Sequence, residues 1–531
     1  MTDFFDNTKP NIILITDHTD TLFLTRSIGP HKVAHELRQA GYEVAVLNFA
    51  HIFCYEEILY ILKNLISDQT LFVGFNNMFY KSIKNQRTIE GQGLVYDEKE
   101  IGTMLPHGKD KNIEIDKFIR GLNPKCRTVL GGPTAQDIPL NSDFDYIVIG
   151  YADISIVNLA NHLLDKEELL KSHRSIYGPI IVNDSTAPTF DFSNSTLHYK
   201  SYDCILPGET LTIEISRGCI FKCAFCNYPL NGKKKLDFIK SADSIKNEFL
   251  QNYEKYKVTR YIFSDDTLND SVEKIQLINA ISAQLPFKLE YWAYLRLDLL
   301  AAHPETIDLL FDSGLRGCHF GIETFNPDVG KRIGKGMAKD KQLSALHYIK
   351  SKWKDQSMLH GSFIAGLPGE SEESLQDTFA ELLDINCPLD SWFIQATRIQ
   401  NYIDNPSPEF VSKIEQNPEE FGYKNIRPME NSVYLDWDSE HMSRSRAEEI
   451  SIQHQLYVQQ TGSIKVNGLT SFNIAGLGFD LECSTNVKTS EMDWSFVDAG
   501  KKRRAIEYKK CFYTEFGIPE YILPQTKNWE D

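Results

Sequence analysis

The sequence predicts an α/β protein made of two successive units of parallel strands and helices, followed by a mixed α/β region. Three observations support this prediction. Short apolar runs alternate with helical patterns over residues 11–164, and the same alternation returns over residues 210–398. Such alternation is typical of parallel sheets that helices cover. The remainder, residues 399–531, is rich in aromatic side chains and contains one long helical pattern at 443–459.

The first unit, residues 1–165, is expected to be a Rossmann-like domain. Its apolar runs are short and bounded by turn residues, which is the pattern of buried strands. A helix at 29–40 ends at Gly41, and glycine is a common helix terminator. We expect one parallel sheet with helices on both faces. The predicted strands span 11–16, 43–48, 70–74, 127–130 and 146–149.

Glycines stand near the ends of these strands and at the start of the helix. Glycine has no side chain, so the backbone there can come close to a flat ligand. Open α/β sheets bind their ligands at the carboxyl edge of the strands. The candidate ligand-binding glycines of this unit are Gly29, Gly74, Gly131, Gly132 and Gly150.

Residues 166–205 are expected to be a linker between the two units. They contain Pro179, Pro188 and a stretch rich in Ser, Asn and Asp, and this composition is typical of connecting segments. The linker would deliver the chain to the second unit, residues 206–398.

Six strand patterns alternate with helices in the second unit. Helical patterns include 239–253, 272–283 and 375–383. In barrels of parallel strands, functional groups gather at the carboxyl ends of the strands. The predicted strands span 211–215, 261–264, 289–293, 317–322, 361–364 and 392–396.

Three cysteines, Cys219, Cys223 and Cys226, follow the first of these strands at the spacing C-x3-C-x2-C. Thiolates at this spacing bind three irons of a [4Fe–4S] cluster and leave the fourth iron open to an outside ligand. A zinc site is the alternative, because Cys223 and Cys226 have the spacing of half of one. The nearest candidates for the second half, Cys204 and His198, lack a paired spacing.

This cysteine run, with Phe225 just before its last cysteine, resembles the signature of the radical SAM superfamily. The resemblance implies a partial (β/α)6 barrel over the second unit. It also implies that the free iron binds the amino and carboxylate groups of S-adenosylmethionine (SAM). An electron from the cluster then splits SAM into methionine and a 5′-deoxyadenosyl radical.

Polar residues after the second and third strands fit this resemblance. Asp265 and Asp266 are similar to the turn that contacts the SAM amino group, and helix capping is the alternative for one of them. Arg296 could pair with the SAM carboxylate as a bidentate fork. Its alternative partner is the neighbouring Asp298.

The fourth and fifth strand patterns also carry candidate SAM contacts. Glu323 resembles the ribose-binding motif, and a carboxylate directly after an apolar strand is not expected from packing alone. Gly361 and Gly366 belong to a stretch that resembles the adenine-contacting strand. Cys318 and His319 are adjacent, so their side chains must point to opposite sides, and we expect Cys318 in the core.

The first unit carries a second resemblance, to the cobalamin-binding domain fused to many radical SAM enzymes. It rests on the order of three runs upstream of the cysteines: Ser27-Ile28-Gly29-Pro30, Val129-Leu130-Gly131-Gly132-Pro133-Thr134 and Asp145-Tyr146-Ile147-Val148-Ile149-Gly150. The resemblance implies cobalamin as a third cofactor, beside the cluster and SAM.

Three features depart from that pattern. The D-x-H-x-x-G signature is absent, so the implied form is base-off cobalamin without a histidine ligand. The acidic Gly-Glu-Gly-Glu is here Gly150-Tyr151-Ala152-Asp153. A long insertion lies between Gly74 and Cys126. The alternative is a Rossmann-like domain that has lost the cofactor or binds substrate at its site.

Composition indicates which partners and which cellular compartment to expect. A formal net charge of −17 disfavours nucleic acid, because binding it depends largely on phosphate neutralisation by Lys and Arg. No apolar run reaches membrane-spanning length, and the first residues lack a signal-peptide pattern. Seven of the ten cysteines are scattered singly, which fits a reducing compartment. We therefore expect a cytoplasmic protein.

The two resemblances together imply a cobalamin-dependent radical SAM C-methyltransferase that acts on an unactivated carbon. One SAM would methylate cob(I)alamin, and a second would be cleaved to the radical that activates the substrate. A cyclisation, ring contraction, epimerisation or rearrangement, with cobalamin accessory or absent, is the alternative. The implied partners are a small-molecule or peptide substrate and a reducing protein such as flavodoxin or ferredoxin.

Two further classes are disfavoured. A cluster that only transfers electrons would need a fourth protein ligand, and methylthio transfer to tRNA would need a second cluster and an RNA-binding appendage. Residues 399–531 are expected to close the barrel over the substrate. The family's Pro-Gly-Thr-Pro stretch is replaced there by Asn405-Pro406-Ser407-Pro408-Glu409-Phe410, which predicts a specialised substrate.

Overall fold

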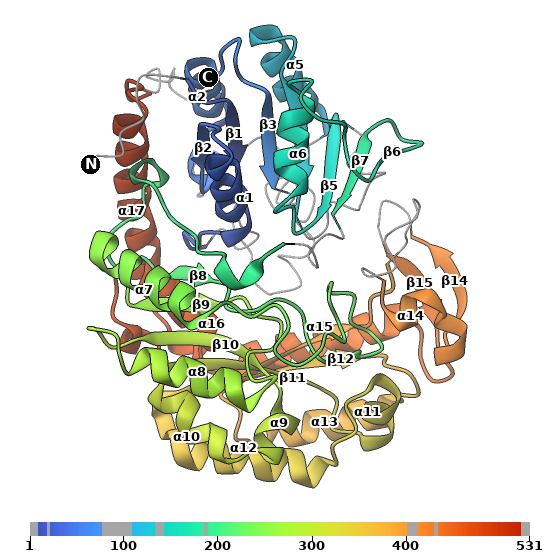
Figure 1. Ribbon diagram of the computed structural model, residues 1–531. Helices are drawn as coiled ribbons and strands as arrows, with labels where there is room; N and C mark the ends of the chain where they lie inside the picture. The colour runs from blue at the N-terminus through green and yellow to red at the C-terminus, as the bar shows by residue number, and fades with distance from the viewer. Residues whose placement is uncertain are drawn as a thin grey trace, which may run out of the picture.

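The computed structural model describes residues 9–17, 22–76, 109–132, 143–184, 190–400, 411–429 and 434–521. Two mainly parallel sheets lie one above the other, and helices surround them (Figure 1). This is the α/β architecture that the alternating patterns predict. Parts of three expected motifs, residues 77–108, 133–134 and 405–410, lie outside the described residues.

The first sheet has the order β2-β1-β3-β4-β5-β7-β6 in the described part of the chain. Strand β1 pairs in parallel with β2 on one side and β3 on the other, which creates a topological switch point. Ligands of open α/β sheets bind at such points. The five predicted strands are β1 (Ile12–Ile15), β2 (Val44–Leu47), β3 (Phe72–Asn76), β4 (Arg127–Gly131) and β5 (Tyr146–Gly150).

Helices cover both faces of this sheet because the strands are apolar on both sides. On one face, Leu37 and Leu159 share a buried core, and on the other face Ile61 and Ile119 share a second core. The first pair comes from α1 (Ile28–Gln39) and α6 (Ser155–His162), the second from α2 (Tyr55–Leu65) and α5 (Lys109–Leu122). The last part of the insertion between Gly74 and Cys126 thus forms helix α5, which lies between β3 and β4 in the chain.

The segment expected as a linker, residues 166–205, instead extends the first sheet. Strand β7 (Ile180–Asp184) pairs in parallel with β5, and β6 (Ser172–Arg174) pairs with β7 in the antiparallel direction. The prediction was wrong there because the apolar run of β7 is only three residues long and directly follows Gly178 and Pro179. These turn residues outweigh so short a strand pattern.

The second unit is a six-stranded parallel sheet whose strands follow one another in space in chain order. This is the arrangement expected for a partial (β/α)6 barrel. Its strands are β8 (Leu211–Ile213), β9 (Arg260–Phe263), β10 (Glu290–Leu295), β11 (Leu315–Glu323), β12 (Met358–Ala365) and β13 (Ser391–Ala396). Its helices are α7 (Ala242–Tyr256), α8 (Val272–Ser282), α9 (Leu297–Ala302), α10 (Glu305–Asp312), α11 (Pro327–Ile333), α12 (Lys339–Trp353) and α13 (Glu372–Leu383).

Strand register arranges the inner face of the barrel in layers. The lowest layer includes Trp292, which pairs with Gly317 on the next strand. Two residues further along, Tyr294 pairs with His319, and His319 pairs with His360. Alternate residues of a strand point to opposite faces. Cys318 accordingly lies fully buried in the core outside this layer, as the sequence predicted.

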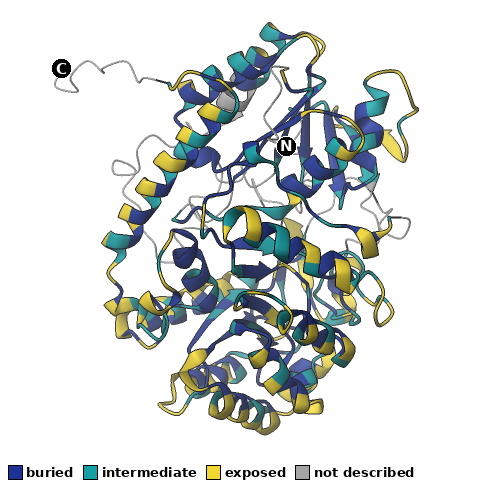
Figure 2. Cartoon of the chain, turned by 60° about the vertical axis from the view of Figure 1, so that its left-hand side comes forward, coloured by how far each residue is buried: buried dark blue, intermediate teal, exposed yellow. Residues whose placement is uncertain are grey.

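The C-terminal region attaches to both units. Helix α16 (Gly468–Gly476) packs below the barrel, where Phe472 and Trp292 belong to one buried cluster. Helix α17 (Trp494–Glu515) runs alongside the first unit and buries Tyr508 and Phe512 in its core (Figures 1 and 2). The remaining elements are α14 (Lys413–Gln416), β14 (Lys424–Pro428), β15 (Leu435–Asp438) and α15 (Arg444–Thr461).

Within the described ranges, none of the helices has both the length and the apolar character that crossing a membrane requires.

The packing of α16 under the barrel predicts a specific loss of stability. Phe472→Ala should lower the free energy of unfolding by about 3–5 kcal/mol, because removing a fully buried ring leaves a cavity. Urea unfolding followed by tryptophan fluorescence measures the change. Leu456→Ala on α15 is the control, since its side chain is 44% exposed, and should change stability by less than about 0.5 kcal/mol. Equal losses would contradict a floor formed by α16.

Candidate active site

The three cysteines lie on the loop that follows β8, and the backbone fixes the shape of this loop. Gly218 has a φ of 72°, and a Cβ there would lie 2.5 Å from the Cβ of Leu230, so only glycine fits. The Gly232 N–H donates to the carbonyl of Cys219 at 2.7 Å. The Ala224 N–H donates to the carbonyl of Ile333 at 3.0 Å, which ties the loop to the end of α11.

Each cysteine sulfur meets a different polar side chain. Arg296 Nη1 donates to Cys223 Sγ at 3.2 Å, and Asn231 Nδ2 donates to Cys226 Sγ at 3.1 Å. Cys219 Sγ lies 3.3 Å from the hydroxyl of Thr267. Hydrogen bonds to sulfur stabilise thiolates and tune the potential of a cluster that they hold. The sequence motif identified the cysteines, but nothing in it pointed to Asn231 or Thr267.

Burial favours the protonated form of two of these thiols. Burial raises the pKa of Cys226 to about 11 and also raises the pKa of Cys219. A coordinated metal deprotonates a thiol outright. Among the described residues, no three His, Cys, Asp or Glu side chains are grouped closely enough to hold a metal ion together. In a cluster, by contrast, each of the three cysteines binds a different iron.

The two adjacent aspartates after β9 differ in environment. Asp265 is 1% exposed, accepts from the Ser216 hydroxyl, and accepts from the Ile215 N–H at 3.2 Å. Lys274 Nζ donates to the same Ser216 hydroxyl at 2.9 Å. Asp265 therefore holds the start of the cysteine loop, and its oxygens are already engaged.

Asp266 is half-buried and remains the accessible carboxylate of the pair. Burial, together with the charges of Asp265 and Glu214, raises its pKa to about 7. A carboxylate in such a place can hold or release a proton near neutral pH. It can also accept from an ammonium group. The structure thus separates a buried aspartate that supports the loop from one that can meet a ligand.

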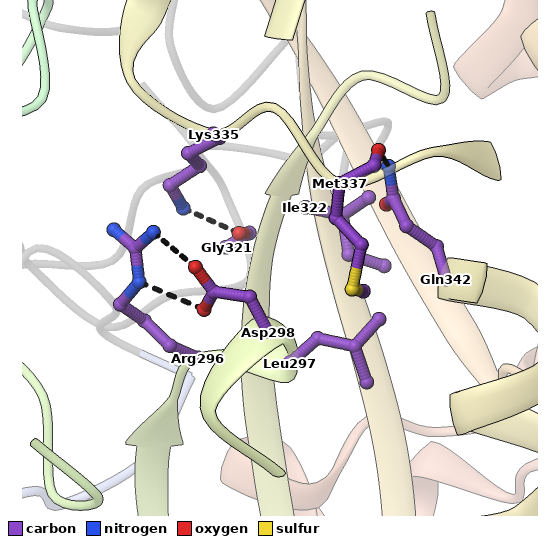
Figure 3. A pocket seen from close by; sticks show the side chains of 8 residues that line it. All are labelled: Arg296, Leu297, Asp298, Gly321, Ile322, Lys335, Met337 and Gln342. Atoms are coloured by element: carbon purple, nitrogen blue, oxygen red, sulfur yellow. Dashed lines mark hydrogen bonds and ion pairs between the residues drawn. The ribbon is translucent and has the colours of Figure 1, made fainter. Parts of the chain in front are cut away.

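Arg296 pairs with Asp298, the partner that the sequence analysis gave as the alternative to the SAM carboxylate. Its guanidinium pairs with Asp298 through Nε at 3.0 Å and Nη2 at 2.6 Å (Figure 3). The same group lies 3.7 Å from the ring centroid of Phe221 and donates to Cys223. Arg296 therefore joins the cysteine loop to the carboxyl end of β10.

Glu323 lies at the end of β11, as predicted, and pairs with a lysine. Lys335 Nζ is 3.0 Å from Glu323 Oε1 and also donates to the carbonyl of Gly321. Glu323 has a φ of 67°, a left-handed conformation that costs energy for a residue with a side chain. The adjoining cavity is lined by Arg296, Leu297, Asp298, Gly321, Ile322, Lys335, Met337 and Gln342 (Figure 3).

The glycines of the fifth strand are surrounded by protein. A Cβ on Gly361 would lie 2.8 Å from Leu389 and 3.2 Å from Ile322, in the core outside the barrel. Gly366 has a φ of 77°, and a Cβ there would lie 2.5 Å from the Trp437 ring. Its N–H donates to Glu370 at 2.7 Å. The absence of a Cβ at both positions thus serves packing. Phe225, by contrast, is half-buried, and Lys335 Nζ lies 5.9 Å from its ring centroid.

Most of the candidate glycines of the first unit lie at the carboxyl edge of the sheet, whereas one lies inside a strand. Gly131 and Gly150 end β4 and β5, and Gly29 is the second residue of α1, where a Cβ would meet nothing within 4 Å. Gly132 follows with a φ of 117°. Gly74 lies inside β3, and a Cβ there would lie 2.7 Å from Leu14. Gly74 therefore makes room for a neighbouring strand, because β3 continues two residues further than predicted.

A buried arginine joins the two units, and the sequence analysis missed it. Arg217 precedes the cysteines and is 4% exposed. It pairs with both carboxylate oxygens of Asp153, with Nη2 to Oδ1 at 3.0 Å, and its Nε donates to Glu214 at 2.8 Å. Its guanidinium also lies 4.2 Å from the ring centroid of Tyr151. We call these contacts the Arg217 network. Asp153 and Tyr151 belong to the departure Gly150-Tyr151-Ala152-Asp153.

One family model matches the chain. Residues 213–382 match the model described as Radical SAM superfamily. The match extends from β8 into α13, so it includes the cysteine loop and the ends of β9, β10 and β11.

Two curated methyltransferases resemble parts of the chain. The bacteriochlorophyllide d C-12(1)-methyltransferase of Chlorobaculum tepidum is 26% identical over 196 residues, which are 36% of this chain and 41% of that protein. An uncharacterized methyltransferase of Pyrococcus horikoshii is 25% identical over 295 residues, which are 51% of this chain and 61% of that protein. The chain thus spans about half the length of these relatives.

A solved structure resembles the whole chain in fold. TsrM from Kitasatospora setae, a radical S-adenosylmethionine methyltransferase with tryptophan substrate and a SAM analog bound, matches 94% of this chain and 99% of its own. The TM-score is 0.61 and the sequence identity is 14%. Another structure of the same enzyme holds cobalamin and a [4Fe-4S] cluster. At this identity, the likeness shows a shared fold.

The buried Glu370 beside Gly366 predicts a pH-dependent stability. Burial raises its pKa to about 8, above the ordinary value of 4.5. Stability from the neutral carboxyl is therefore fully present below about pH 4.5 and is lost as the pH rises to about 8. Glu370→Gln stays neutral, so its thermal midpoint should exceed that of the unaltered protein increasingly between pH 5 and pH 8.

Melting curves across this pH range measure the difference. Glu373→Gln is the matched control, because Glu373 is an exposed glutamate three residues further along, in the first turn of α13. Its midpoint should follow that of the unaltered protein at every pH. A constant offset for Glu370→Gln across the range would contradict a raised pKa at Glu370.

Proposed function

We propose that the protein is a cobalamin-dependent radical SAM C-methyltransferase, because residues 213–382 match the model of the radical SAM superfamily. The observation that carries the proposal is the cysteine loop. Its three sulfurs are each in contact with a separate polar side chain, at the carboxyl ends of parallel strands. When bound, the cluster, SAM and cobalamin supply the radical and the methyl group.

In this proposal Cys219, Cys223 and Cys226 hold the cluster. The donors around them favour bound thiolates, since Arg296 brings a positive charge and Asn231 an amide N–H to the sulfurs. Hydrogen bonds of this kind are one of the means by which proteins set a cluster's potential. The residues around the cysteines thus fit an iron–sulfur cluster, because they present hydrogen-bond donors to the sulfurs.

For SAM, the open Asp266 is the candidate partner of the amino group, since Asp265 is engaged in the loop. Glu323 is the candidate for the ribose hydroxyls, and Phe225, within the cysteine loop, is a further candidate contact of SAM. Arg296 would meet the SAM carboxylate only by sharing its ion pair with Asp298. Gly361 and Gly366 would contribute through the shape of the backbone, because their missing side chains face other parts of the protein.

For cobalamin, the carboxyl edge of the first sheet is the candidate site. Gly29, Gly131, Gly132 and Gly150 lie there, and Gly29 has free space where a side chain would stand. The Arg217 network holds this edge against the cysteine loop. A flat ligand at the edge would therefore lie next to the cysteine loop, within reach of SAM bound there, which would supply the methyl group to cobalamin.

Two kinds of similarity support the proposed activity. The curated relatives are methyltransferases, and TsrM binds cobalamin and a cluster in the fold that this chain shares. We further propose a small-molecule or peptide substrate and a reducing protein as partners. The division into units at residues 1–165, 166–205, 206–398 and 399–531 belongs to this proposal, with the 166–205 segment as part of the first sheet's edge.

The cluster ligands give the first test. Replacing Cys219, Cys223 or Cys226 by Ala should abolish formation of 5′-deoxyadenosine from SAM, because one iron loses its thiolate. Anaerobically reconstituted protein is reduced with dithionite, and iron and nucleoside are quantified. Cys483→Ala, at an exposed cysteine outside the loop, should keep both. Turnover retained without one of the three cysteines would contradict the proposal.

Cobalamin retention gives the second test. Reconstituted protein offered hydroxocobalamin should elute from gel filtration with about one cobalamin per chain, and the product of a true substrate should gain the mass of a methyl group. Gly29→Leu should reduce retention, because its side chain fills the open space at the sheet edge.

Gly121→Leu is the matched control, since a Cβ there also meets nothing within 4 Å and it lies at the far end of α5. It should retain cobalamin normally. A cluster that forms while cobalamin washes away would favour a radical rearrangement without methyl transfer.

A further inference from the structure

We propose that His51, held by Asp17 at the carboxyl edge of the first sheet, is the protein ligand of the cobalt in cobalamin. We call His51 and Asp17 the edge dyad. This inference rests on the proposed function, and it assigns one residue of the cobalamin site that is proposed there.

The edge dyad joins the ends of two neighbouring strands. Asp17 comes two residues after β1, and His51 belongs to the single helical turn Ala50–Ile52 that follows β2. His51 Nδ1 lies 2.6 Å from Asp17 Oδ1, and the two side chains are 6% and 1% exposed. The imidazole and the carboxylate thus form a buried pair in direct hydrogen-bond contact.

The backbone fixes the turn that carries His51. The Thr16 N–H donates to the carbonyl of Leu47 at 2.9 Å, and the Ala50 N–H donates to the carbonyl of Thr16 at 3.1 Å. Phe49, directly before the turn, has a φ of 54°. This left-handed conformation costs energy for a residue with a side chain, and it persists only where the surrounding structure requires it. The position of His51 is therefore set by β1 as well as by its own strand.

The edge dyad lies at the topological switch point of the first sheet, where β1 stands between β2 and β3. The Asp17 N–H donates to Oδ1 of Asn76, the last residue of β3, at 3.1 Å, and Asn76 Nδ2 donates to the Asp17 carbonyl at 2.8 Å. Ser27 Oγ lies 3.5 Å from the same carbonyl, two residues before Gly29. The dyad therefore lies beside the start of α1, where Gly29 leaves open space for a flat ligand.

One ring nitrogen of His51 has no protein partner. Because Nδ1 faces a carboxylate, Nδ1 carries the hydrogen, and the neutral imidazole presents its lone pair at Nε2. This Nε2 atom is buried and makes no hydrogen bond within the part of the chain that the structure describes. A buried polar atom without a partner costs free energy. Its place at the edge where open sheets bind their ligands indicates that a ligand supplies the partner.

The chemistry of the dyad fits a metal that a macrocycle already holds. A metal-binding histidine almost always donates its other ring N–H to a carboxylate, a carbonyl or water, as His51 does to Asp17. Among the residues with a described position, no three His, Cys, Asp or Glu side chains are grouped closely enough to hold a metal ion. A free metal ion would therefore lack ligands, whereas the cobalt of a corrin has its ring nitrogens and needs only one more.

The sequence analysis expected cobalamin without a histidine ligand, because the D-x-H-x-x-G signature is absent. In that signature the two residue types are two positions apart, whereas 34 positions separate Asp17 from His51. Binding would exchange one nitrogen ligand for another: Nε2 takes the place of the benzimidazole of the cofactor. Nδ1 keeps its proton, and no electron is transferred. The cofactor would still be base-off, as the resemblance implies.

The experiment identifies the axial ligand by its nuclear spin. The protein is produced with ¹⁵N-labelled histidine, reconstituted without oxygen, offered hydroxocobalamin, passed through gel filtration and reduced to cob(II)alamin with dithiothreitol. In the electron paramagnetic resonance spectrum, an axial ¹⁴N nucleus splits each cobalt line into a triplet and ¹⁵N splits it into a doublet. We expect a triplet from unlabelled protein and a doublet from labelled protein. Bound benzimidazole would give a triplet in both.

A substitution assigns the signal to one histidine. Labelled His51→Gln keeps an amide donor for Asp17 and should lose the doublet. His347→Gln, at an exposed histidine on α12, is the matched control and should keep it. Iron content and circular dichroism verify that each variant folds. A His51→Gln protein that folds, holds iron and no longer retains cobalamin would also support the inference.

Three results would overturn the inference: a triplet from labelled protein, no nitrogen splitting, or a doublet that persists in His51→Gln. They would assign the axial position to benzimidazole, to a ligand other than nitrogen, or to another histidine. Each of them, with cobalamin bound and 5′-deoxyadenosine formed, would leave the proposed function standing. Cobalamin that fails to co-elute with the unaltered protein would count against both.

Discussion

The buried Arg217 network is the interaction on which the arrangement of the site depends. Arg217 belongs to the cysteine loop, and Asp153, its partner, follows the last parallel strand predicted in the first unit. Burying charges is costly unless they are paired with good geometry, and removing one partner leaves the others uncompensated. Here one guanidinium serves two carboxylates and an aromatic face. The carboxyl edge of the first sheet is therefore held against the loop that carries the cysteines.

A second buried network fixes the same loop from the barrel side. Asp265 and Lys274 both bind the Ser216 hydroxyl, directly before Arg217. The loop is thus held at one residue by the barrel and at the next by the first unit. Such support determines where the sulfurs lie before any metal binds, which limits the reorganisation that binding requires. It also explains why only one of the two adjacent aspartates is open to a ligand.

The sequence predicted the elements well because their signals are local. Apolar runs such as that of β1 and the spacing of Cys219, Cys223 and Cys226 are read within a few residues. Contacts between residues far apart in the sequence could not be predicted in this way. Asp153 is 64 residues from Arg217, and Thr267 is 48 residues from Cys219. Strand β7 was missed because turn residues adjoin a three-residue apolar run. Gly361 was placed at the right strand, but which side its absent Cβ faces depends on tertiary packing.

The departure Gly150-Tyr151-Ala152-Asp153 gains a physical meaning from these contacts. Asp153 binds Arg217, and the ring of Tyr151 lies against the same guanidinium. The acidic side chain and the ring of this departure thus both contact the arginine of the cysteine loop, so the departure joins the two units.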